Sequence, residues 1–276
     1  MPKSPSEVAY LIFDVESIAD GDLIARTRYP DMGYTPREAI ATYQDELVET
    51  KGTTFIPHTY QIPISVVIAK VSATGELLDL VSLDEPEFRS HVMTANFWKG
   101  WEAYGYPTWV TFNGRSFDMP LMELAAFRYG IPLKHWFGGS GYSAPRNRFN
   151  QKSHCDLQEV LTNYGASRCN GGLNLMANLV AKPGKIGLKG DLVQEKYDQG
   201  ELQAISDYCR CDVLDTYFVF LRTQTLSGAW TLDHELSMVE KAKQWVTSRA
   251  DEASVYGDYL EYWGQWENPW TGDDSQ

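Results

Sequence analysis

The chain has 276 residues, enough for one large domain with a sizeable buried core, or for one domain with additions. Its 22 glycines and 13 prolines exclude a collagenous or low-complexity protein, and no apolar run reaches the roughly 20 residues that a membrane-spanning helix needs. The formal net charge of -13 argues against a protein that coats nucleic acid by charge alone.

The first half of the chain predicts a sheet built around one central strand. Its polar N-terminus lacks the small-residue cleavage site of a signal peptide, so we expect a cytoplasmic protein whose four cysteines are reduced. Residues 8–13 form a compact apolar run without a helical period, which is typical of a strand buried on both faces. The β-branched segment 62–71 and the alternating segment 76–83 predict a hairpin, and 108–112 predicts another strand.

Segments with helical spacing of apolar residues follow these strands. Strands and helices in this order predict an α/β domain with a mixed central sheet flanked by helices. We assign residues 1–250 to this domain, with an insertion at 20–60 that we expect to be a long loop around one helix, and residues 251–276 to a C-terminal tail. The predicted helices are 37–48, 87–104, 119–129, 156–164, 173–180, 205–226 and 233–249.

Charge is distributed unevenly along the chain. Between Lys134 and Lys196 nine basic residues face four acids, which suits contact with a short anionic segment, and the alternative is a solvated surface of mixed charge. The tail from Asp251 contains seven acids, no Lys or Arg, and six aromatic residues. These rings predict that a helical turn or two docks on the domain or on a protein partner.

Two carboxylates come directly after the first predicted strand. Asp14 and Glu16 are two residues apart, so in an extended chain they point to the same side, where they can bind a hard divalent cation. The alternative is a solvated strand end. Asp233 and Glu235 have the same spacing but begin a predicted helix, where acids favour the helix dipole. Only the first pair predicts a metal site, because only it ends an apolar central strand.

Two further groups of polar residues follow a later strand and lie on a late helix. Asp118 predicts the N-cap of a helix with Pro120 in its first turn, and a cap at a strand-to-helix junction is compatible with a role in a site. Tyr208 and Asp212 are four residues apart, so they share one helical face. The alternative is a tyrosine packed in the core and an exposed aspartate. Asp215 shares that face and is the alternative ligand.

Together these residues suit the hydrolysis of a phosphodiester bond. Four acids can coordinate two divalent cations, Mg²⁺ or Mn²⁺, which promote in-line attack of water and stabilise charge on the attacking and leaving oxygens. Tyr208 has an unperturbed pKa of about 10 and is therefore a poor general base at neutral pH. We expect its hydroxyl to orient the attacking water by hydrogen bonding.

The three groups resemble the motifs of a known enzyme family. D-x-E after a central strand, N-x-x-x-F-D after a later strand and Y-x-x-x-D in a late helix are similar to the motifs of the DEDDy 3′–5′ exonucleases, which belong to the ribonuclease H-like superfamily. The flanking segments, such as L-I-F-D-V-E-S and F-N-G-R-S-F-D-M-P, most resemble the stand-alone group related to the exonuclease domain of family B DNA polymerases. The resemblance covers residues 8–226. It implies a ribonuclease H-like three-layer fold and cleavage at the 3′ end of single-stranded nucleic acid, DNA in preference to RNA.

The resemblance also implies roles for individual residues. Asn113 and Phe117 fall where such enzymes shape the pocket for the terminal nucleotide. Apart from the resemblance, the glycine-rich segment 184–190 lacks the G-K-[ST] end of a P-loop but lets its backbone or Lys189 approach a phosphate. The implied metal ligands and water-orienting phenol are Asp14, Glu16, Asp118, Asp212 and Tyr208.

Two alternatives to a DNA exonuclease stay open. One is an exoribonuclease with the same chemistry. The other is a nucleic-acid-binding accessory module of a replication or repair complex that keeps the fold without turnover, which the presence of all four acids and the tyrosine disfavours. The cysteines do not have zinc-ligand spacing, and apolar neighbours at helical intervals predict that Cys209 and Cys211 are core residues.

Overall fold

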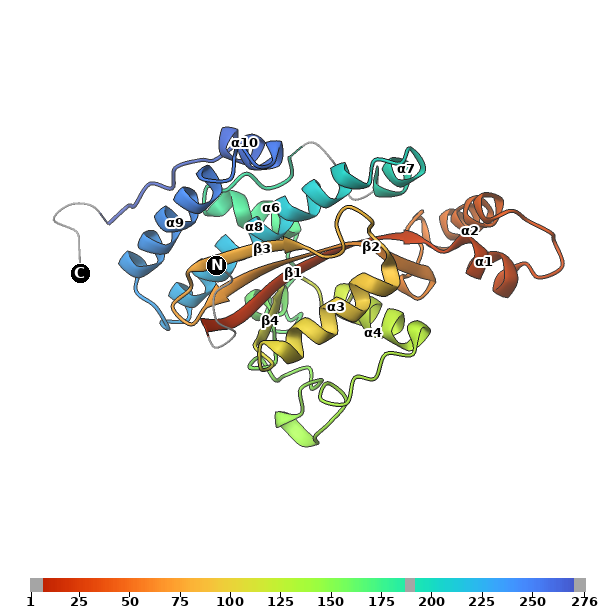
Figure 1. The fold of residues 1–276 in the computed structure, drawn as a ribbon, viewed down its shortest axis with the longest axis horizontal. Helices are drawn as coiled ribbons and strands as arrows, with labels where there is room; N and C mark the ends of the chain where they lie inside the picture. Colours follow the sequence, from red (N-terminus) through yellow and green to blue (C-terminus); the bar gives the residue numbers. More distant parts are fainter. Residues whose placement is uncertain (1–6, 187–191, 271–276) are drawn as a thin grey trace.

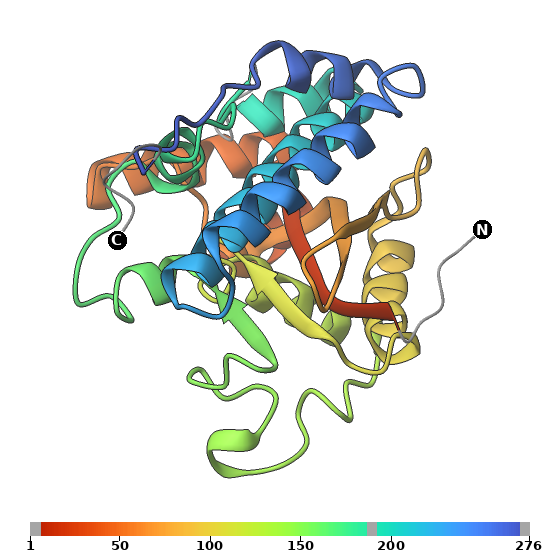
Figure 2. The same cartoon turned by 90° about the vertical axis from the view of Figure 1, so that its left-hand side faces the viewer.

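The protein has three layers, with a central sheet between two groups of helices. A computed structural model describes residues 7–186 and 192–270. In Figure 1, α3 and α4 lie below the sheet, and α8, α9 and α10 lie above it. Figure 2, turned by 90°, shows the same layers and the long segment between α4 and β5, which extends from the lower end of the molecule. This is the α/β arrangement with a flanked mixed sheet that the sequence predicts.

The sheet combines antiparallel and parallel pairing. β1 pairs antiparallel with β2, and β2 pairs antiparallel with β3, so the predicted hairpin is confirmed. On its other side β1 runs parallel to β4, which runs parallel to β5. In the order β3-β2-β1-β4-β5 the central strand is therefore the first in the chain. The strands are β1 (Val8–Ala19), β2 (Gln61–Ser72), β3 (Leu77–Ser82), β4 (Thr108–Thr111) and β5 (His154–Asp156).

The helices occupy most of the predicted segments. The sequence analysis missed α1 and α7 as well as the short strand β5. No helix in residues 7–186 and 192–270 is long and apolar enough to cross a membrane. The helices are α1 (Gly21–Arg28), α2 (Pro36–Lys51), α3 (Ser90–Ala103), α4 (Asp118–Tyr129), α5 (Leu157–Leu161), α6 (Gly172–Leu179), α7 (Val193–Asp198), α8 (Leu202–Leu226), α9 (Leu232–Thr247) and α10 (Ser254–Glu261), with short 3-10 turns at His58–Tyr60 and Gly141–Ser143.

β1 is buried on both faces because its alternate side chains enter two different cores. Leu11, Phe13 and Val15 pack with α3 and α4 in one core. Ile12 belongs to the other core, which α8 dominates. Since side chains two residues apart in a strand share a face, Asp14 and Glu16 are directed to the same side as Ile12, toward α8.

β1 is longer than predicted, so its two carboxylates lie within the strand and not after it. The parallel pairing of β1 with β4 ends at Ile12, opposite Val110. The antiparallel pairing with β2 continues past Asp14 and Glu16 to Ala19. The apolar run contains the part of β1, Tyr10 to Ile12, that has strands on both sides. The carboxylates sit where one neighbouring strand has ended, which leaves room for a site.

The 20–60 insertion is a helical hairpin and not a long loop. α1 and α2 lie beyond the end of the sheet at the right of Figure 1, around a small apolar cluster of their own. α2 begins with a capping box between Thr35 and Glu38 and ends at Gly52, which has a left-handed backbone conformation. α1 was missed because it is short and buries only Gly21 and Ile24, so its apolar periodicity is weak.

Part of the C-terminal tail packs against α8. In α10, Tyr259 is fully buried and its hydroxyl donates a 2.7 Å hydrogen bond to Oδ1 of Asp215, itself fully buried. Burial raises the pKa of the Asp215 carboxyl well above its ordinary value, and the bond from Tyr259 opposes that shift. Tyr262, at the end of α10, is 62% exposed. Two tyrosines three residues apart therefore have different surroundings.

These surroundings predict different effects of the same substitution. Tyr259→Phe removes a buried donor from a buried carboxylate, so we expect the free energy of unfolding to fall by about 1–3 kcal/mol. Tyr262→Phe should change it by less than about 0.5 kcal/mol. Urea titration followed by circular dichroism measures both values. Equal stability of the two variants would contradict the importance of the contact between Tyr259 and Asp215.

Candidate functional site

Three carboxylates from distant parts of the chain meet beside the sheet. One oxygen each of Asp14, Glu16 and Asp212 lies within 4.8 Å of the other two. β1 supplies the first two side chains and α8 supplies the third. All three residues are partly exposed, so the group is accessible from solvent. We call these three residues the carboxylate trio.

The electrostatics of the trio favour a bound cation. Burial raises the pKa of the carboxyls of Asp14, Glu16 and Asp212. Repulsion raises each pKa further: Asp118 acts on Asp14, Asp14 acts on Asp212, and both Asp14 and Asp212 act on Glu16. Lys185 is the basic residue whose charge opposes the shift at Glu16 and Asp212. Oxygen donors of like charge at this spacing fit a hard divalent cation such as Mg²⁺ or Mn²⁺. The residues present therefore suit the expected cofactor.

Asp118 lies beside the trio but does not cap its helix. It is the first residue of α4, the N-cap position is occupied by Phe117, and no side chain caps the helix there. Oδ1 of Asp118 instead accepts a 3.1 Å hydrogen bond from the backbone N–H of Val15, in β1. The N-cap prediction is wrong because this distant donor holds the carboxylate. The negative charge of Asp118 is close enough to raise the pKa of Asp14. The role of Asp118 as a fourth metal ligand stays a prediction.

Tyr208 is one helical turn before Asp212 on α8 and is 6% exposed. Burial raises the pKa of its hydroxyl far above the ordinary value, and the negative charges of Asp212 and Glu16 raise it further. The phenol therefore stays protonated at neutral pH and can donate a hydrogen bond, which fits a role in orienting water and not a role as base. Asp215, the alternative ligand, is outside the trio and accepts from Tyr259 instead.

Cys209 is buried, as predicted for a core residue, but it also contacts the trio. Its thiol lies 3.4 Å from the backbone oxygen and 3.4 Å from Oδ2 of Asp14. Cys211, also buried, is the second predicted core cysteine. All four cysteines are free thiols, as expected.

The predicted substrate-binding residues are in different situations. The side-chain oxygen of Asn113 accepts hydrogen bonds from Ser116 (2.6 Å) and Gln158 (3.0 Å), so it stabilises its own loop. The ring of Phe117 lies 5.8 Å from that of Phe55, which the 20–60 insertion contributes. Phe55 is 57% exposed, so a second ring is available beside Phe117. Lys189 lies outside the described residues.

Asp156 holds the loop that leads to Asp118, a role that the sequence analysis missed. It caps α5, because its carboxylate accepts from the backbone N–H groups of Gln158 and Glu159. The same carboxylate also accepts from the backbone N–H groups of Asn113 at 3.0 Å and Arg115 at 2.8 Å. The side chain of Asp156 is buried, with 2% exposed. It connects the end of β5, to which it belongs, with the loop that follows the parallel strand β4. Capping could be predicted locally, but the second pair of bonds depends on how the strands are paired.

Comparison with known proteins agrees with the motifs. Residues 53–263 match the model of a family described as a predicted 3′–5′ exonuclease related to the exonuclease domain of PolB. The matched range contains Asp118, Tyr208 and Asp212, begins after Asp14 and Glu16, and extends past residue 250. No curated protein matches the chain. The family and the mixed sheet with its flanking helices together confirm the ribonuclease H-like α/β fold.

The two roles of Asp156 predict a large effect of its removal. Asp156→Ala leaves four backbone N–H groups without their acceptor, so we expect the free energy of unfolding to fall by about 2–4 kcal/mol. Asp45→Ala, at an exposed position of α2, is the matched control and should lower it by less than about 0.5 kcal/mol. Chemical denaturation measures both. If the free energy of unfolding of Asp156→Ala fell by only about 1 kcal/mol, the usual effect of losing a helix cap, the bonds to the loop would be unimportant.

Proposed function

Because this chain belongs to the family of predicted 3′–5′ exonucleases related to the exonuclease domain of PolB, we propose that it hydrolyses phosphodiester bonds at the 3′ end of single-stranded nucleic acid. We propose DNA as the substrate in preference to RNA. The observation that carries the proposal is the carboxylate trio, in which Asp212 meets Asp14 and Glu16 although almost two hundred residues separate it from them in sequence.

The trio and Asp118 supply the ligands that such a reaction needs. Two divalent cations, when bound, lower the pKa of water and stabilise negative charge on the oxygens that attack and leave. The carboxylates of Asp14, Glu16 and Asp212 would hold these cations, and Asp118 would complete the set from the first turn of α4. Its hydrogen bond from Val15 fixes its position relative to β1.

Other residues around the trio would orient the substrate and the water. The buried, protonated hydroxyl of Tyr208 can donate to a water molecule or accept from it, and so align it with the phosphorus atom. Lys185 contributes positive charge near Glu16 and Asp212, which favours a phosphate at this end of the site. The exposed ring of Phe55 and the neighbouring ring of Phe117 provide faces on which a terminal base can stack.

Labelled oligonucleotides test this function directly. The full chain is mixed with single-stranded DNA, duplex DNA and RNA, each labelled at the 5′ end, with Mg²⁺, with Mn²⁺ or with EDTA. We expect a ladder of products shortened from the 3′ end, fastest with single-stranded DNA and absent with EDTA. Cleavage that continues in EDTA, or loss of 5′ nucleotides first, would contradict the proposal. Binding without turnover would favour a non-catalytic module.

Substitution of Asp14 tests the trio. Asp14→Ala removes one of the three carboxylates, so we expect hydrolysis to fall below detection while the circular dichroism spectrum stays that of the folded chain. Asp233→Ala is the matched control, because Asp233 has the same D-x-E spacing but is exposed at the start of α9. It should retain wild-type turnover. Wild-type turnover in folded Asp14→Ala would show that the site is elsewhere.

Substitution of Tyr208 tests the orientation of water. Tyr208→Phe keeps the ring and removes the hydroxyl, so we expect the rate to fall on the order of 10²–10⁴-fold with little change in oligonucleotide affinity. Tyr10→Phe is the control, because Tyr10 is four residues before Asp14 but packs against Phe220 in the core. Single-turnover rates and fluorescence anisotropy separate the two effects. An unchanged rate in Tyr208→Phe would leave this residue with a packing role alone.

A further inference from the structure

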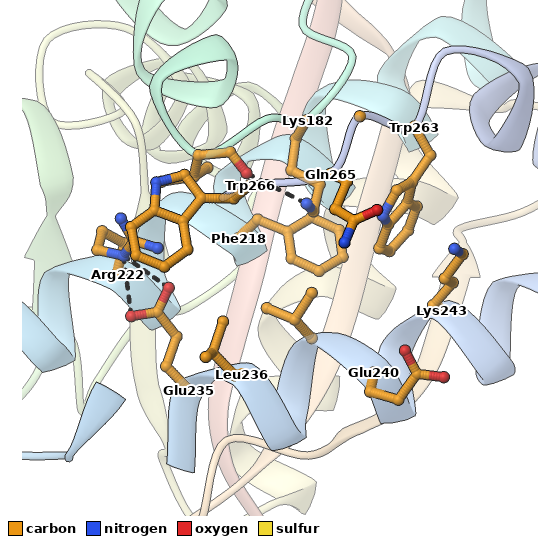
Figure 3. A pocket seen from close by; sticks show the side chains of 13 residues that line it. Lys182, Phe218, Arg222, Glu235, Leu236, Glu240, Lys243, Trp263, Gln265 and Trp266 are labelled. Carbon is orange, nitrogen blue, oxygen red and sulfur yellow. Dashed lines mark hydrogen bonds and ion pairs between the residues drawn. The ribbon is translucent and has the colours of Figure 1, made fainter. Parts of the chain in front are cut away.

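A cavity of about 410 Å³ lies between α8, α9 and the segment that follows α10. In Figure 3 the side chains of Trp266 and Trp263 stand on opposite sides of it, and Phe218 lies between them. Leu236, on α9, lines the side opposite Lys182. The volume is in the range of pockets that bind small molecules. The cavity therefore combines a suitable size with three aromatic side chains.

A buried lysine faces this cavity without a carboxylate partner. Lys182 is 4% exposed, and its ammonium group donates only to the backbone oxygens of Val180 and Ala181, each at 3.2 Å, among the residues that the structure describes. The ammonium lies 4.7 Å from the ring centre of Trp263 and 5.2 Å from that of Phe218. Taking a charge out of water without a counter-ion is costly, so such a group favours the arrival of an anion.

Two more cations lie around the same space. Arg222 donates to Glu235 through Nε at 2.6 Å, and no bond from its two terminal nitrogens is seen in the described parts of the chain. Its guanidinium lies 4.3 Å from the ring centre of Trp266. Lys243 is exposed on α9 at the other side. Burial lowers the pKa of Lys182 to about 8. The negative charges of Asp215 and Glu235 oppose this shift, and the positive charges of Arg222 and Lys243 add to it.

The charge of the lining is positive but not uniformly so. Glu235 is bound to Arg222, and Glu240 lies on α9 beside Lys243. Against these two acids stand the three cations Lys182, Arg222 and Lys243. One net positive charge and a cation without an acidic partner suit one small anion. They do not suit a long polyanion.

We propose that this cavity binds a nucleoside monophosphate. Its phosphate would accept hydrogen bonds from Lys182 and Lys243 and supply the negative charge that the buried ammonium lacks. Its base would lie against the indole rings of Trp263 and Trp266, since aromatic faces bind every base by stacking. The side-chain amide of Gln265 points into the same space and can hydrogen-bond the edge of the base.

The proposed pocket is separate from the carboxylate trio. None of the residues that line it belongs to the trio, and Asp212 and Arg222 are ten residues apart along α8. A helix rises about 1.5 Å per residue, so this separation is about 15 Å along the axis. Nucleoside monophosphates are also the product class of the proposed exonuclease reaction. The evidence for the pocket does not depend on that reaction, because it comes from the cavity and its cations.

Calorimetric titration of the full chain with adenosine 5′-monophosphate tests the proposal. EDTA in the buffer prevents cation-dependent binding at the trio. Inorganic phosphate and adenosine are titrated separately, and we expect each to bind more weakly than the monophosphate. Lys182→Met and Lys243→Met should each weaken binding about 10- to 100-fold, the effect of losing one charge-assisted hydrogen bond. Trp266→Leu should also weaken it, and circular dichroism checks that each variant is folded.

Two controls make the outcome specific. Lys241→Met removes a lysine two residues from Lys243 on α9 that does not line the cavity, and Asp14→Ala alters the trio. Both should bind the monophosphate as the wild type does. The proposal is overturned if the wild type does not bind it, if phosphate alone binds as tightly, or if Lys243→Met and Trp266→Leu are without effect. If the wild type bound the monophosphate but showed no exonuclease activity, the proposed function alone would be overturned.

Discussion

The burial of β1 on both faces is the constraint on which the rest of the structure depends. Its apolar side chains fill two cores alternately, so Leu11 and Phe13 are committed to the side of α3, and Ile12 is committed to the side of α8. The same alternation fixes Asp14 and Glu16 on the α8 side. A slip of one residue would exchange the two sets and place carboxylates in the aromatic core around α3, at a large desolvation cost. The position of the site is thus set by the packing of the strand that carries it.

The long helix α8 connects the site with the C-terminal segment. Along α8, Asp212 completes the trio and Tyr208 lies one turn before it. Further along the same helix, Asp215 contacts Tyr259, and Arg222 lines the cavity beside Trp266. The contact between Asp215 and Tyr259 lies between the other two along the helix. Residues 254–266 therefore belong to the same packed unit as α8, and the matched family range, which reaches residue 263, includes most of them.

The features that could be predicted from sequence are those determined by local spacing. The alternation in β1 predicted that Asp14 and Glu16 share a face, and the helical interval predicted the same for Tyr208 and Asp212. Features that depend on distant partners could not be predicted. Asp118 was expected to cap α4, but the backbone of Val15 binds it instead, because β1 and α4 are brought together only by the fold. The second pair of bonds at Asp156 requires β5 beside β4, and β5 has only three residues, too few for a periodic signal.

The energetics of the trio distinguish it from the ion pairs elsewhere in the molecule. Two buried acids elsewhere in the fold are paired with arginine, Glu235 with Arg222 and Asp20 with Arg128. At the trio three carboxylates are placed together, and burial and repulsion raise the pKa of each. Such an arrangement lowers the stability of the protein by itself, and natural structures retain it where function needs it. A cation that binds only the folded state returns that stability by mass action. Repulsion within the trio and affinity for a divalent cation are therefore two consequences of the same placement of charge.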